Sequence, residues 1–130
     1  MNTLVKKLSQ GEISELKSIL NMYLNVINHH NININNILSE YNIIKTNNNA
    51  DNTKLIELAK IQKKINNIHS KEMAAYKFYI KYYQSTDDKE ILDGLHTIKS
   101  TYNKVLLLLD NINTDILKIN PFIVMPSNTK

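Results

Sequence analysis

Residues 91–119 carry an apolar stripe that constrains the fold of this chain more than any other feature. The apolar positions alternate in steps of four and three residues, which is the repeat of a helix that packs along another helix. They are Ile91, Leu95, Ile98, Tyr102, Val105, Leu109, Ile112, Ile116 and Ile119. Pro121 ends the stretch, because the residue before a proline avoids helical geometry. The stripe predicts a long helix over residues 87–119 whose apolar face other helices must cover.

Acidic residues mark the start of this helix. Asp87 is predicted to be the N-cap, with Glu90 at the third position after it. Asp88 then adds negative charge to the first turn, where the helix dipole favours it. Gly94 costs about 1 kcal/mol relative to alanine inside a helix. It is therefore a candidate for a close contact with a neighbouring helix.

A second stripe predicts a helix over residues 10–45, which begins after the capping-box spacing of Ser9 and Glu12. The stretch 31–35 (NININ) is its weak point, because it alternates with the period of a strand and asparagine is a poor helix former. The stripe stays in phase across this stretch, which favours one continuous helix. A break near residue 30 would instead give four helices. The stripe consists of Ile13, Leu16, Leu20, Tyr23, Ile27, His30, Ile34, Ile37, Tyr41 and Ile44.

A third stripe predicts a helix over residues 53–84, after a polar, asparagine-rich loop. The stripe slips at Glu72, in the manner of a stutter that relaxes a supercoil locally. Phe78 and Tyr82 are expected to point away from it. Its members are Leu58, Ile61, Ile65 and Ile68 before the slip, and Tyr76, Tyr79 or Ile80, and Tyr83 after it.

Three long helices with short connections predict an all-α fold, an elongated antiparallel three-helix bundle with coiled-coil-like packing. Residues 1–120 are expected to form the single domain and residues 121–130 a C-terminal tail. Each helix of about 30 residues would be roughly 45–50 Å long. The chain has only 2 Gly and 2 Pro, which argues against an all-β fold with many tight turns.

Composition indicates the kind of source and compartment. The chain has 20 Asn, 19 Ile and 16 Lys, residues with AT-rich codons, and this bias fits the AT-rich genomes of many phages and large DNA viruses. There is no cysteine, so disulfides and thiolate metal sites are excluded. The longest run of Val, Leu and Ile, residues 105–109, is far below the roughly 20 residues of a membrane span. Without a signal peptide, we expect a cytoplasmic protein or one carried within a virion.

Two apolar segments are candidates for contact with a protein partner or a second copy. Leu106, Leu107 and Leu108 make the third helix apolar nearly all round, and an exposed patch of this kind usually marks an interface. The tail holds four large apolar residues between two prolines, and it could dock on the same chain or on a partner. Those four residues are Phe122, Ile123, Val124 and Met125.

His30, His69 and Tyr102 are predicted to share one level of the bundle. Antiparallel pairing of the first two helices places His30 opposite His69, and the second hairpin brings Tyr102 to the same level. Such a layer could bind a metal or respond to pH, but no carboxylate or third histidine stands at ligand spacing. The favoured interpretation is that His30 fixes the helix register, with no metal ion and no cofactor.

The function that these patterns favour is that of a non-enzymatic structural or adaptor component, such as a virion or phage protein. No phosphate loop, nucleophile motif or metal signature indicates an enzyme. One alternative is a nucleic-acid-associated protein, because lysines and tyrosines interleave in residues 71–83 and the net charge is +4. Arginine is absent, which weighs against this alternative. An assembly or secretion chaperone that holds a partner helix is a further alternative.

Overall fold

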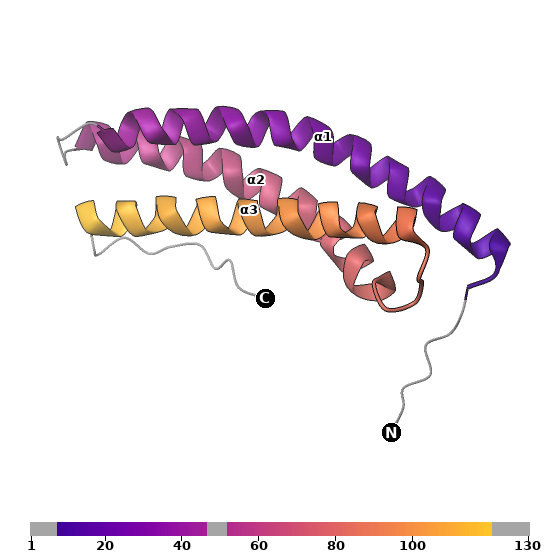
Figure 1. Ribbon diagram of the computed structural model, residues 1–130. Coiled ribbons are helices and arrows are strands. Elements are labelled where there is room, and N and C mark those ends of the chain that lie inside the picture. The colour runs from indigo at the N-terminus through magenta and orange to yellow at the C-terminus, as the bar shows by residue number, and fades with distance from the viewer. Residues whose placement is uncertain (1–7, 47–51, 121–130) are drawn as a thin grey trace, which may run out of the picture.

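The computed structural model describes residues 8–46 and 52–120, and these residues form three long helices and no strand. The helices are α1 (Gln10–Thr46), α2 (Asn52–Tyr82) and α3 (Lys89–Ile119), and they lie side by side in an elongated bundle (Figure 1). At a rise of about 1.5 Å per residue, α1 is roughly 55 Å long and the others roughly 46 Å. The predicted all-α three-helix bundle is confirmed.

Contacts between the helices show their relative directions. His30 of α1 contacts Glu72 of α2, whereas Glu40 contacts Lys64, so the residue numbers rise on α1 as they fall on α2. The same reversal relates α2 to α3, through the pairs Gln62–Asn113 and His69–Tyr102. Consecutive helices are therefore antiparallel, and α1 runs parallel to α3.

Helix α1 is continuous through residues 31–35, so the four-helix alternative is wrong. Figure 1 shows it as one gently curved helix. Ile34 and Ile37 are both buried and keep the heptad phase, whereas Ile32 points to solvent. Because most helix stability in a protein comes from packing of an apolar face, burial outweighs the poor propensity of the asparagines.

The stripe of α2 does not slip, which corrects the expected stutter. Its buried row keeps steps of three and four residues through Glu72 and Ala75 to Tyr79. Glu72 occupies a core position, and this is why a search for apolar residues alone finds a gap there. Two further expectations are wrong: Phe78 is buried, and Tyr83 is exposed just beyond the end of the helix.

The apolar core consists of two clusters with a polar layer between them. Each cluster contains residues of all three helices. One cluster ends at Ile27, Ala75 and Ile98, and the other begins at Ile34, Ile68 and Val105. The buried polar residues of the described chain all fall in the interval between them, and they are His30, His69, Glu72 and Thr101.

Gly94 allows the close approach of α1 and α3. A Cβ atom at this position would lie 2.5 Å from Cδ2 and 3.0 Å from Cγ of Leu20, which is itself buried. Any larger residue would force the Leu20 side chain to shift. The close helix contact expected at this glycine is therefore present.

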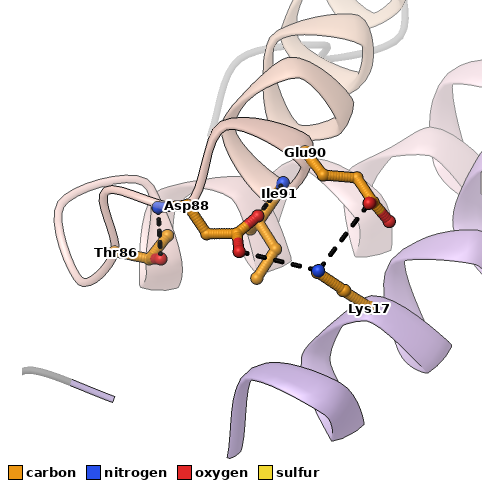
Figure 2. A network of polar contacts seen from close by, with 5 residues as sticks. All are labelled: Lys17, Thr86, Asp88, Glu90 and Ile91. Carbon is orange, nitrogen blue, oxygen red and sulfur yellow. Dashed lines mark hydrogen bonds and ion pairs between the residues drawn. The ribbon is translucent and has the colours of Figure 1, made fainter. Parts of the chain in front are cut away.

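The start of α3 is held by a small polar network (Figure 2). The side chain of Asp88 accepts a hydrogen bond from the backbone N–H of Ile91 at 3.1 Å, and its own N–H donates to Thr86 Oγ1 at 3.0 Å. Lys17 Nζ of α1 lies 3.6 Å from Asp88 and 3.7 Å from Glu90. Asp88 is thus the N-cap, and the prediction of Asp87 is wrong by one residue.

Alanine substitution should separate these two aspartates. We expect Asp88→Ala to lower the free energy of unfolding by about 1–2 kcal/mol, because it removes the cap of α3. Asp87→Ala should change it by less than about 0.5 kcal/mol, since Asp87 is exposed. Urea unfolding followed by circular dichroism measures both values. Equal losses in the two variants would contradict the assignment of the cap.

Candidate functional site

The polar layer at mid-bundle is built around a buried histidine and a buried glutamate that contact each other. The Nδ1 atom of His30 on α1 is hydrogen-bonded to Oε2 of Glu72 on α2. His30 is 5% exposed and Glu72 1%. Heptad packing turns both side chains into the core, and the antiparallel pairing of α1 and α2 sets them face to face. Burial of this kind is tolerated only because each group finds a partner of complementary character.

Glu72 is not fully satisfied by this contact. Its second carboxylate oxygen, Oε1, is buried and has no hydrogen-bond partner among the described residues. A buried polar atom left without a partner costs about 1–3 kcal/mol. The pair is therefore weak as a source of stability. It is better suited to choosing one alignment of the helices, because any other alignment would separate these two buried polar groups.

His69 and Tyr102 form the second contact of the layer. Tyr102 Oη lies 3.3 Å from Nε2 of His69, and the two rings stack with centroids 5.5 Å apart. Tyr76 also stacks on the Tyr102 ring, with centroids 4.1 Å apart. Burial lowers the pKa of the His69 imidazole below its ordinary value of 6.5. Burial, followed by the charge of Tyr76, raises the pKa of the Tyr102 hydroxyl. His69 is thus held in its neutral form near pH 7.

The three residues predicted for the layer are all placed at mid-bundle, but in two separate contacts. His69 meets Tyr102, and the partner of His30 is Glu72, which sequence reasoning had treated as an interruption of the stripe. Glu72 lies on the heptad repeat opposite a core histidine, and that coincidence is the signal that could have identified it. Within the described residues, no group of three or more His, Cys, Asp or Glu side chains could hold a metal ion.

The predicted leucine surface on α3 is smaller than expected. Leu107 is 63% exposed and Leu106 is half-buried, whereas Leu108 is 4% exposed and belongs to an apolar cluster. Leu108 is buried because α3 packs against two helices and so turns a wider face inward. Its side chain therefore belongs to the core rather than to the exposed surface predicted for it, and partner contact at Leu106 and Leu107 stays a prediction. Phe122, Ile123, Val124 and Met125 lie outside the described residues.

Helix α1 carries exposed aliphatic side chains that sequence reasoning missed. Ile43 is 72% exposed, and three others on this helix are at least about half exposed. A heptad search overlooks such residues, because it selects the positions in phase with the core. Met22 and Ile43 are three heptads apart and so share one outward side of the helix. The four residues are Met22, Val26, Ile32 and Ile43.

The aromatic stretch of α2 packs on itself, on α1 and on α3. The Phe78 ring meets Tyr23 of α1 at 5.1 Å and Tyr82 at 5.0 Å, and Tyr79 stacks with Tyr76 and Tyr83. Phe78 and Tyr79 are buried, so their rings are not open to stacking by bases. Lys77 and Lys81 remain at the surface.

A groove runs between α1 and α2. It contains two hollows of about 960 and 370 Å³. Four lysines of α2 line it, together with Glu40 of α1 and Glu57 of α2. Lys64 Nζ lies 3.2 Å from the carboxylate of Glu40, across the groove. The lysines are Lys60, Lys63, Lys64 and Lys71.

Comparison with protein-family models, with curated proteins and with solved structures finds no match to this chain. Of the helices that the structure describes, none is both long and apolar enough to cross a membrane.

A double-mutant cycle tests the His30–Glu72 pair. His30→Leu or Glu72→Leu alone should lower the free energy of unfolding by about 3 kcal/mol or more, because each leaves the other group buried without its partner. The double variant should lose less than either single one, since leucine suits the surrounding core. The same cycle on the exposed pair Glu40 and Lys64 is the control, with a coupling below about 1 kcal/mol. Additive losses at His30 and Glu72 would disprove the coupling.

His69 should make stability depend on pH in one direction. Its pKa is lower in the folded chain than the ordinary 6.5, so below pH 6.5 the unfolded chain binds more protons. The contribution of neutral His69 to the free energy of unfolding is thus complete above pH 6.5, and it is lost as the pH falls further. As the pH is lowered from 7.5 to 5.5, we expect the free energy of unfolding of His69→Phe to rise relative to that of the native chain. Urea titrations measure both values. An NMR titration that gave His69 a pKa of 6.5 or higher would contradict this sign.

Proposed function

We propose that this protein is a non-enzymatic structural component that assembles with other protein molecules through outward-facing aliphatic side chains. The observation that carries the proposal is the exposure of Met22, Val26, Ile32 and Ile43 on α1. Single exposed apolar residues are ordinary, but several along one helix mark surface that a partner can cover. Each large aliphatic side chain contributes about 1.5–3 kcal/mol when it is fully buried from full exposure.

The described polar groups of the core support a structural role over a catalytic one. Glu72 is engaged with His30, and His69 with Tyr102, so these candidate acid and base groups contact one another inside the bundle. The abundance of Asn, Ile and Lys supports the further proposal that the assembly is a virion or phage particle, through the AT-rich codons of these residues.

A nucleic-acid-associated protein is the second candidate function, favoured by the four lysines of the α1/α2 groove. Lysine side chains that neutralise phosphates give binding that weakens steeply as salt is raised. The chain has no arginine, the side chain that binds phosphate in bidentate fashion. This candidate is therefore placed second, and the oligonucleotide measurement described in the next subsection tests it.

Self-association is the direct test of the leading proposal. We expect the mass measured by light scattering to rise above the 15.1 kDa of one chain as the concentration increases from about 1 to 500 µM. The variant Ile32→Ser/Ile43→Ser should stay monomeric over this range, because it removes two exposed aliphatic side chains and leaves the core intact. Asn25→Ser/Asn35→Ser changes two exposed polar residues of the same helix and should behave like the native chain. A native chain that stays monomeric throughout would contradict self-association.

A further inference from the structure

The groove between α1 and α2 is one continuous feature. Its two hollows share Glu40, Lys64 and Asn67, and among the described residues the lining comes from α1 and α2 alone. The groove therefore faces away from α3. On α2 its lining extends from Glu57 to Lys71, which corresponds to about 21 Å of helix. This length matches roughly four turns of a helix laid along it.

The floor and the rim of this groove differ in character. Ile37, Ile44 and Ile68 contribute buried apolar side chains to the lining. The lysines are exposed and stand at the rim, on the side of α2. Asparagine, serine and histidine side chains supply most of the remaining lining, so the groove has a small apolar floor and a polar, mainly basic rim. Such a surface can receive a helix with a narrow apolar face. The rim carries four lysines against two glutamates, and Glu40 is already paired with Lys64, so the positive charge is in excess.

The charge of the rim selects among the possible occupants. The ends of this chain do not match it, because residues 1–7 and 121–130 contain lysines and no acidic residue. Nucleic acid fits poorly, since no Phe, Tyr or Trp ring of the described residues lines the groove for bases to stack on, and the chain has no arginine for bidentate contacts with phosphate. An acidic protein segment with an apolar face satisfies both the floor and the rim.

We propose that the α1/α2 groove binds an acidic amphipathic helix of a partner protein. The partner helix is about four turns long, with apolar residues at steps of three and four toward the isoleucine floor. Aspartate or glutamate residues on its flank face the lysines of α2. The inference rests on the proposed function of binding protein, but it concerns a different surface from the aliphatic side of α1.

The test starts from selection of a phage-displayed library of random 16-residue peptides on the immobilised full chain. The enriched peptide is then labelled and titrated by fluorescence anisotropy. We expect enrichment of Asp or Glu together with Leu, Ile or Phe at helical spacing. Lys60→Glu/Lys63→Glu/Lys71→Glu should weaken binding of this peptide by about tenfold or more, because it reverses the charge of the rim.

A matched variant controls for net charge. Lys77→Glu/Lys89→Glu/Lys104→Glu changes the charge equally at three exposed lysines outside the groove, and it should bind the peptide within about twofold of the native chain. Circular dichroism checks the folding of both variants. If the first does not fold, Lys60→Gln/Lys63→Gln/Lys71→Gln replaces it, with the same direction expected.

Four results would overturn the proposal. The first two are that no peptide is enriched, or that the enriched peptides lack acidic residues. The third is an equal loss of peptide affinity in the two charge variants. The fourth is that a labelled 20-residue oligothymidylate binds more tightly than the peptide and that the groove variant loses this binding. Loss of self-association in the groove variant would assign the groove to a second copy and overturn it as well. The variant Ile32→Ser/Ile43→Ser should keep full peptide binding, so failure of the self-association proposal is distinguishable from failure at the groove.

Discussion

The contact between His30 and Glu72 is the constraint on which the alignment of this bundle depends. A heptad repeat of isoleucine and leucine looks almost the same after each step of seven residues, so apolar packing alone fixes the alignment of two helices weakly. A slide of α1 by one heptad along α2 would place Glu72 against Tyr23 or Ile37 instead of His30. Against Ile37 the buried Glu72 side chain would have no hydrogen-bond partner, and in either slide His30 would lose its carboxyl partner, which is strongly unfavourable. The stability of the pair itself is secondary to this discrimination.

The remaining architecture adapts to the alignment that this pair selects. With α1 and α2 aligned, Lys17 lies beside the start of α3, and Leu20 lies over the gap that Gly94 leaves open. At the other end of the bundle, Tyr41 of α1 donates a hydrogen bond of 2.6 Å to Asp115 of α3. Burial, together with this hydrogen bond, raises the pKa of the Tyr41 hydroxyl. These contacts lie on opposite sides of the polar layer. A single alignment of the helices therefore allows the contacts at both ends of the bundle.

The periodicity of the sequence was sufficient to predict the three helices, the main buried rows of α1 and α3, and that of α2 as far as Ile68. It failed where a polar residue occupies a core position, as at Glu72, and where two neighbouring aspartates both satisfy the pattern of an N-cap, as at Asp87 and Asp88. The burial of Leu108 depends on how much of the surface of α3 the two neighbouring helices cover. The apolar stripe of α3 alone does not indicate this. The α1/α2 groove could not be predicted either, because it is shaped by side chains of two helices whose lateral arrangement only the fold defines.

The polar layer has a second consequence, which concerns the unfolding of the bundle. Each apolar cluster draws on all three helices, so each half is a small bundle with its own packing. Cooperative unfolding follows the limits of contiguous packing, and here those limits coincide with the layer. We therefore expect one half to be able to fray while the other keeps its helices assembled. The layer divides the packing of the core into two parts, although all three helices pass through it without a break.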